Sequence, residues 1–289
     1  MIFCCYLWCS SQSLSAQDED LLAILEEEPT RDFVMASFKT NRVINLHSLE
    51  NTAKGVLDFK IGHRFGFLSG GFYELFGLDN ATIRLGLDYG LTDQWTIGLG
   101  RSSFEKTYDG FVKYKFLRQS TGKINMPITA AFFTSIAING LRWENPNRDH
   151  VFSQRLAYTF QLIVGRKFNK LFSLQLSPTL VHRNLVETEA EANDVFSLAA
   201  AARLKITKRM TINAEYLYTF PDQLATEFTN AFSIGIDLET GGHVFQLHFT
   251  NATAMVEKGF FTETTGRWQD GDIHFGFNVS RVFTIVKAR

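Results

Sequence analysis

The segment from residue 82 to residue 100, TIRLGLDYGLTDQWTIGLG, alternates apolar and polar residues on both sides of a tight turn at Thr92 and Asp93. Before the turn, Ile83, Leu85 and similar residues fall on one face, whereas small, polar or charged residues fall on the other. A period of two on both sides of a turn predicts a β-hairpin. The chain repeats this pattern roughly a dozen times without helical segments between the repeats, which predicts a transmembrane barrel with hydrocarbon outside and a polar interior.

The composition suits a membrane barrel better than an enzyme built from mixed helices and strands. The chain has 289 residues, of which 45% are hydrophobic, yet it lacks the long apolar runs that helical membrane spans require. Aromatic residues make up 14% of the chain and include 28 Phe, whereas only 5 Pro are present, which suits long, uninterrupted strands. The net charge of −1 provides no basic excess, so no nucleic-acid partner is predicted.

The first residues have the character of a secretory signal. All three cysteines (Cys4, Cys5 and Cys9) lie in a short apolar opening that ends in small residues at Ala16. We therefore predict a signal peptide over residues 1–16, although no Lys or Arg precedes its apolar stretch. The mature chain then contains no cysteine, which excludes disulfides, thiolate nucleophiles and cysteine-ligated metals.

The remaining chain divides into a lead-in and a barrel. We assign residues 17–55 to an N-terminal periplasmic extension or plug, with a short acidic helix over 17–28. The alternation over 33–46 is imperfect and is compatible with an extra strand, a periplasmic extension or a segment inside the lumen. Residues 56–289 are assigned to the transmembrane β-barrel.

The predicted fold is all-β: a single up-and-down antiparallel transmembrane barrel of about twelve strands. The expected strands are 56–66, 81–91, 94–102, 106–117, 126–139, 152–166, 171–182, 194–206, 210–219, 227–239, 243–251 and 270–285. Short and long connections alternate between them, as expected for periplasmic turns and extracellular loops. Two connections fit poorly, because the one after 94–102 is short and the one over 118–125 is long. An even strand number places both termini on the periplasmic side.

Several short motifs carry a resemblance to a known family. They are FKIGHRFG at 59–66, LFGLDNA at 75–81, GLGRS at 98–102, YDG at 108–110, Pro178 with His182 and Arg183, and TGGH at 240–243. Together they resemble an uncharacterised β-barrel family of Bacteroidota, a domain of unknown function, over nearly all of the chain after Asn41. The resemblance implies a barrel in the outer membrane of a Gram-negative bacterium and implies no activity, ligand or catalytic residue.

The inward face of the predicted barrel is rich in charge. By strand parity it carries Asp58, Lys60, Arg64, Arg84, Asp88, Asp109, Lys113, Lys115, Arg155, Arg203, Lys205, Glu215 and Asp237, with polar Gln161, Gln175, Asn213, Gln246, His248, His274 and Asn278. These are eight cations and five carboxylates, which must pair with one another or meet water. Two interpretations remain open: a lumen filled by ion pairs without a through-path, and a narrow cation-lined conduit that favours anions. The N-terminal segment could plug either one.

Enzymatic and metal sites are not predicted. His63 and His182 share the outward parity, and of the remaining histidines only His248 and His274 share the inward face, which is too few for a metal site. No G-x-S-x-G or P-loop motif is present, so we predict no catalytic residue and no cofactor. The expected partners are outer-membrane lipid and lipopolysaccharide, the barrel-insertion machinery and small solutes. A closed scaffold whose loops bind a partner protein or glycan, and a membrane-embedded hydrolase, are the alternative functions.

Overall fold

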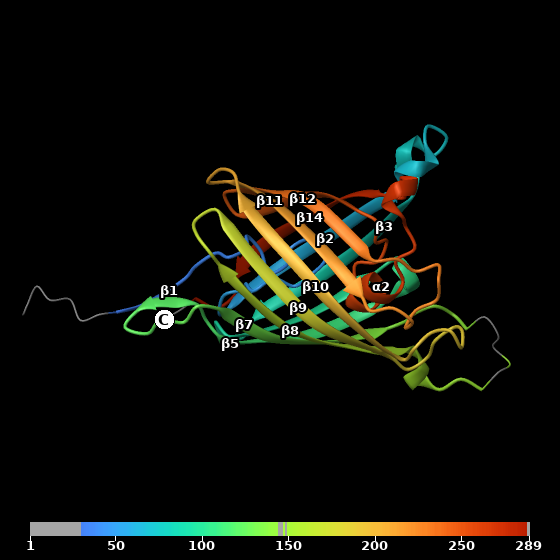
Figure 1. The fold of residues 1–289 in the computed structure, drawn as a ribbon, viewed down its shortest axis with the longest axis horizontal. Helices are drawn as coiled ribbons and strands as arrows, with labels where there is room; N and C mark the ends of the chain where they lie inside the picture. Colours follow the sequence, from blue (N-terminus) through green and yellow to red (C-terminus); the bar gives the residue numbers. More distant parts are fainter. Residues whose placement is uncertain (1–29, 144–146, 148, 288–289) are drawn as a thin grey trace, which may run out of the picture.

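Twelve antiparallel strands close into one barrel in the computed structural model, which describes residues 30–143, 147 and 149–287 (Figure 1). The strands are β2 (Val56–Phe67), β3 (Ala81–Gly90), β4 (Trp95–Ser102), β5 (Tyr108–Leu117), β7 (Thr129–Ile138), β8 (Leu156–Lys167), β9 (Phe172–Arg183), β10 (Asp194–Lys205), β11 (Met210–Thr219), β12 (Ala231–Thr240), β13 (His243–Thr250) and β14 (His274–Thr284). Each strand pairs with its neighbours along the chain, and β14 pairs with β2 to close the barrel. The predicted fold class is therefore confirmed. The predicted signal peptide and the predicted helix over 17–28 lie outside the described residues.

The period-two sequence pattern becomes an outside and an inside. Along β3 and β4, Leu87 and Leu99 point outward and are 47% and 69% exposed, whereas the alternate side chain of Asp88 is 1% exposed. Aromatic rings on neighbouring strands stack on the outer face, as Trp95 does on Tyr114 at 4.3 Å between ring centroids. Outward apolar side chains in a closed barrel form the surface that meets hydrocarbon.

The long connection over 118–128 forms structure of its own. Its strand β6 (Ser120–Gly122) pairs with β1 (Arg31–Phe33) in a separate two-stranded sheet. Figure 1 places this sheet beyond the barrel, at the end where the C-terminus also lies. The length of the connection is thus accounted for, because part of it serves as the pairing partner of β1.

Short helical turns occupy the connections at the other end of the barrel. They are η1 (Leu68–Gly70), η2 (Leu75–Gly77), η3 (Phe104–Lys106), η4 (Phe152–Arg155), α2 (Glu257–Thr262) and η5 (Trp268–Asp270). None of the helices in the described residues is long and apolar enough to cross a membrane. The turn η3 fills the connection after β4, which is short where the alternation of connections predicts a long one.

Two irregular segments fill the barrel interior. We call residues 37–50 the plug, and residues 251–264, which contain α2 and connect β13 to β14, the inner loop. Nearly every plug residue is buried, including Val43 and Ser48, which are both 0% exposed. Figure 1 shows α2 within the barrel outline, toward the end opposite β1. Most of the segment over 33–46, which the sequence could not place, therefore lies in the lumen, whereas Phe33 belongs to β1 outside the barrel.

Arg155 was predicted to line the lumen, and the structure corrects this prediction. Strand β8 begins at Leu156 instead of residue 152, so Arg155 lies in the turn η4. Its guanidinium donates to the backbone carbonyl of Asn139 at 2.9 Å and lies 4.1 Å from the ring centroid of Trp143. Strand parity does not apply to a residue in a turn, and the loop takes this side chain instead of the lumen.

Candidate functional site

The inner face of the barrel holds the other charged side chains and the two histidines that the sequence placed there. They are Asp58, Lys60, Arg64, Arg84, Asp88, Asp109, Lys113, Lys115, Arg203, Lys205, Glu215, Asp237, His248 and His274. All are buried except Lys115 and Lys205, which are half-buried near the ends of their strands. The structure brings most of these groups against the plug and the inner loop.

Glu215 of β11 anchors the tip of the plug. Its carboxylate accepts hydrogen bonds from three consecutive backbone N–H groups, those of Ile44 (3.2 Å), Asn45 (2.8 Å) and Leu46 (3.1 Å). The tip is a tight turn in which the N–H of Val43 donates to the carbonyl of Leu46 at 2.7 Å. Consecutive N–H groups in a turn form a concave anion site, and bonds to an ionised acceptor are stronger than neutral ones.

The wall also satisfies the backbone carbonyls of the plug. The donors are Gln246 to Val43 (2.7 Å), Asn278 to Ile44 (3.1 Å), Gln175 to His47 (2.7 Å), Lys113 to Ser48 (3.2 Å) and to Glu50, and Arg203 to Ser37 (2.9 Å). An irregular segment cannot satisfy its own backbone groups, so burial of the plug requires partners from the wall. These contacts fix the course of the plug across the lumen.

Two aromatic side chains interrupt the polar inner face. Phe111 of β5 and Phe133 of β7 enclose the ring of His47, with centroid distances of 4.4 Å and 4.2 Å. This contact was not predicted from the sequence. The feature of the sequence that could have indicated it is the presence of two phenylalanines at inward positions of neighbouring strands, where a water-filled lumen would favour polar residues.

The plug and the inner loop meet inside the barrel. Arg42 of the plug forms an ion pair with Glu257 of α2 at 2.9 Å, and His47 Nε2 lies 3.5 Å from the same carboxylate. Arg64 of β2 donates to the carbonyl of Ala254 in the inner loop at 2.9 Å. The lumen is thus occupied by two segments that contact each other as well as the wall.

Ion pairs on the wall account for part of the remaining charge. Arg84 binds Asp109 through two nitrogen atoms, with Nε at 3.0 Å from the carboxylate. Lys60 lies 2.9 Å from Asp58 and 3.9 Å from Asp88. Buried charges require such partners, because an unpaired ion in a dehydrated space is costly.

The two inward histidines differ: both ring nitrogens of the buried His248 lack a hydrogen-bond partner, whereas His274 is hydrogen-bonded. His274 contacts Thr253 Oγ1 at 2.8 Å through Nε2 and the carbonyl of Phe65 at 2.7 Å through Nδ1. His63, on the outer face, stacks on Phe277 at 4.8 Å between centroids. Within the described ranges, no group of three or more His, Cys, Asp or Glu side chains has the arrangement of a metal site.

The ionisation of His47 and Glu257 makes the docking of the plug depend on pH. Burial, followed by the charges of Arg42, Lys113, Arg84 and Lys60, lowers the pKa of His47 well below its usual value of 6.5. Burial raises the pKa of Glu257 above its usual value of 4.5, and Arg42 opposes that shift. A docked plug therefore holds a neutral His47, whereas a released plug would allow the ring to take up a proton.

We predict that acid weakens the docking of the plug through His47. Because the docked form binds fewer protons at this site, docking is strongest above pH 6.5 and is lost progressively as the pH falls below it. The expected loss approaches tenfold per pH unit until the pKa of docked His47 is reached. Hydrogen exchange of residues 37–50, measured against pH, tests this expectation.

His47→Phe is the matched variant, because it keeps the aromatic contact with Phe111 and Phe133. Protonation of Glu257 changes the docking of the plug in the opposite direction, because burial raises the pKa of this carboxyl. Both proteins retain Glu257, so this contribution cancels when the variant is compared with the wild type. The range from pH 8 to pH 5 covers about three units around the usual pKa of histidine. If the two proteins differed in the hydrogen exchange of residues 37–50 by a constant factor over this range, the prediction would be contradicted.

Comparisons with known proteins agree with this architecture. Residues 38–283 match the family described as "Membrane bound beta barrel domain (DUF5777)". No curated protein matches the chain.

Similar solved structures include outer-membrane barrels with different functions. The NanC porin has a TM-score of 0.49 at 9% identity, with 80% of this chain and 100% of that chain covered. An outer membrane channel from Pseudomonas putida F1 has a TM-score of 0.48 at 11% identity, with 81% and 98% covered. Outer membrane phospholipase A from Escherichia coli has a TM-score of 0.43 at 10% identity, with 85% and 95% covered. At these values the likenesses carry no function over to the chain.

Proposed function

The chain belongs to the DUF5777 family of membrane bound β-barrel domains, and we propose that it is a plugged channel that passes small solutes, with a preference for anions, when the plug leaves the lumen. A closed antiparallel barrel with an apolar outer face is the form in which proteins span the bacterial outer membrane, and the protein lies in that membrane. The source in Bacteroidota remains a prediction from the sequence motifs.

The observation that carries the proposal is the kind of partner that the wall cations have. Lys113 and Arg203 bind backbone carbonyls of the plug, and Arg64 binds a carbonyl of the inner loop. Carbonyl groups carry only partial charge, so departure of the plug would leave Lys113 and Arg203 facing the lumen as full charges. Cations that line a narrow pore favour anions.

The polar character of the plug contacts supports its release. The hydrogen bonds from the wall to the plug come from side-chain amides, cations and one carboxylate, and water can replace each of these partners. The apolar side chains of Phe38, Val43, Leu46 and Leu49 pack in the buried core and oppose release. The net free energy of a hydrogen bond that is exchanged for water is about 1 kcal/mol. The plug also follows directly from β1, at the barrel end that Figure 1 shows beside the C-terminus, so a pull on the N-terminal chain would act on it.

Bilayer recording tests the proposal. The full chain should be closed most of the time, whereas a variant without residues 37–50 should give discrete conductance with a reversal potential that indicates anion preference. In the variant, Lys113→Gln should reduce that preference, and Lys170→Gln should not, because Lys170 is exposed in the turn between β8 and β9. A barrel that is silent with and without residues 37–50, or that prefers cations, would refute the proposal.

A second candidate function rests on the loop between β2 and β3. Phe72 and Tyr73 are 82% and 94% exposed there, next to exposed Phe76. Exposed aromatic side chains of this kind suit a closed scaffold that binds a partner protein or glycan. This function would be favoured if the purified protein recovered a partner from outer membranes, if deletion of the loop abolished that recovery, and if the barrel without the plug showed no conductance. Hydrolysis of lipid or peptide by the purified protein would instead favour the enzyme alternative.

A further inference from the structure

The outer face of the barrel is hollowed around Gly110 of β5. A groove of about 610 Å³ lies there, lined mainly by apolar side chains that include Leu87, Leu99 and Ile136. The outward row of side chains runs from Leu99 across Gly110 to Ile136, and the glycine leaves a gap in that row. A Cβ atom at Gly110 would lie 3.2 Å from Leu99 and 3.9 Å from Ile136, so these two side chains form the walls of the gap.

The groove opens to the hydrocarbon of the membrane, because it lies on the outward face of the barrel. Its volume falls within the roughly 300–1,000 Å³ of sites for small molecules. An acyl chain in the groove gains packing contacts, but it gains no hydrophobic stabilisation, because it leaves surroundings that are equally apolar. A groove of this kind therefore selects one lipid over others only if the headgroup of that lipid is bound as well.

A cation and a tyrosine lie beside the groove, toward the end of the barrel opposite β1. Arg101 comes two residues after Leu99 on β4, and it pairs with Tyr108, which comes two residues before Gly110 on β5. Two residues along a strand span about 7 Å. The guanidinium carbon of Arg101 lies over the ring of Tyr108, 5.3 Å from the ring centroid. A guanidinium placed against an aromatic ring keeps its N–H groups for an oxyanion.

The guanidinium of Arg101 is free to bind an anion. In the part of the chain that the structure describes, it forms no ion pair and no hydrogen bond, and its direct neighbours on β3 and β5 are uncharged. Glu105 follows closely along the chain, but it pairs with Lys258 of the inner loop at 2.9 Å. Lys106, two residues before Tyr108, is exposed and has no ion pair among the described residues either. The rim beside the groove therefore carries unpaired positive charge.

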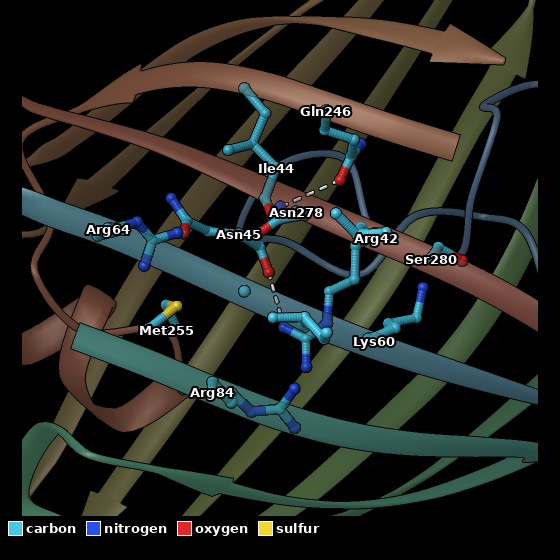
Figure 2. Close-up of a pocket in the computed structure, with 13 residues that line it drawn as sticks. Arg42, Ile44, Asn45, Lys60, Arg64, Arg84, Gln246, Met255, Asn278 and Ser280 are labelled. Atoms are coloured by element: carbon cyan, nitrogen blue, oxygen red, sulfur yellow. Dashed lines mark hydrogen bonds between the residues drawn. The ribbon is translucent and has the colours of Figure 1, made fainter. Parts of the chain in front are cut away.

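The position of Arg101 corresponds to the headgroups of the outer leaflet. Among the described strands, it is the only Arg or Lys at an outward position in the half of the barrel opposite β1. The other wall cations of this half face the lumen, as Figure 2 shows for Arg64 and Arg84. A charge on a lipid-facing strand is tolerated near the interface, where tyrosine is also common. This end carries the longer connections, such as 68–80 and 251–273, which face the outside in outer-membrane barrels.

We propose that this face binds one phosphorylated lipid of the outer leaflet, the lipid A portion of lipopolysaccharide, with a phosphate on Arg101 and an acyl chain in the groove over Gly110. Phosphate suits the site because its oxygens accept paired N–H groups of a guanidinium. The separation of about 7 Å between the two rows lets one lipid reach both. The site does not depend on passage of solutes through the lumen, so this proposal and the proposed function can fail separately.

Native mass spectrometry of the full chain in detergent micelles, titrated with lipid A, tests the site. One lipid should bind saturably to each barrel, and removal of the phosphate groups from the lipid should abolish this binding. Arg101→Gln should weaken binding about tenfold or more, because hydrogen bonds to a charged group are lost. Arg281→Gln is the matched control and should bind as the wild type does: Arg281 lies 5.0 Å from the ring centroid of Phe283 on the outer face, but near the other end of the barrel and away from the groove.

Gly110→Leu tests the groove separately from the phosphate contact. The glycine does not have a positive φ, and an added Cβ would press only on the flexible end of Leu99, so the barrel should fold and melt as the wild type does. The added side chain should fill the groove and weaken binding about threefold through lost packing contacts. Unchanged affinity in Arg101→Gln, equal binding of the lipid without phosphate, or binding of many lipids without saturation would overturn the proposal. A dimer without lipid that Gly110→Leu dissociates would assign the groove to a second copy of the chain and would overturn it as well.

Discussion

Replacing Glu215 with alanine should release the plug from the barrel wall. The substitution leaves the three N–H groups of Ile44, Asn45 and Leu46 without their acceptor in a buried place. Hydrogen bonds to a charged group contribute about 1.5–3 kcal/mol each, so docking of the plug should weaken by about 4 kcal/mol or more. That corresponds to roughly a thousandfold change in the ratio of docked to released plug.

Hydrogen exchange and limited proteolysis of residues 37–50 measure this change directly. Glu215→Gln should fall between the wild type and Glu215→Ala, because the amide keeps one carbonyl oxygen as an acceptor. Glu239→Gln is the matched control: Glu239 pairs with Lys39 at the rim, is 47% exposed, and should contribute less than about 1 kcal/mol. If the plug of Glu215→Ala exchanged as slowly as that of the wild type, Glu215 would not be its anchor.

The barrel could be predicted from the sequence because its strands repeat one simple pattern. The expected hairpin over residues 81–102 is present as β3 and β4, and its turn lies where Thr92 and Asp93 were assigned. Strand ends were less accurate, as the start of β8 at Leu156 illustrates. Alternation fixes which face a side chain takes, but hydrogen bonds of the flanking turns decide where pairing stops.

The contents of the lumen could not be predicted in the same way. Glu215 was expected to pair with another side chain or to meet water, whereas it binds backbone N–H groups about 170 positions away along the chain. Every residue except proline has a backbone N–H group, so the amino-acid sequence does not indicate which of these groups will bind Glu215. The position of the inner loop inside the barrel could not be predicted either, because residues 251–264 have the composition of an ordinary connection. Tertiary contacts such as the ion pair of Arg42 with Glu257 hold this loop inside the barrel.

The pair of Arg84 and Asp109 supports a second large prediction, which concerns the stability of the barrel itself. The two side chains lie on β3 and β5, on either side of Gly100 in β4. A Cβ atom at Gly100 would collide with Arg84 and Asp109, so the glycine makes the space in which the pair forms. The contact uses two guanidinium nitrogens and both carboxylate oxygens, with Nε at 3.0 Å.

Asp109→Ala should destabilise the barrel by about 3–5 kcal/mol, because it leaves Arg84 charged and buried, with only the more distant carboxylates of Asp88 and Glu257 to compensate it. The corresponding fall in Tm is on the order of 10 °C. The double variant Arg84→Met with Asp109→Leu should be close to the wild type or more stable, since apolar side chains of similar volume carry no cost of dehydration. Thermal unfolding of the single and double variants, followed by the change in mobility on a gel, provides the comparison. If the double variant were less stable than Asp109→Ala, the pair would contribute net stability. Loss of the pair, and not the unpaired buried charge of Arg84, would then explain the destabilisation of Asp109→Ala.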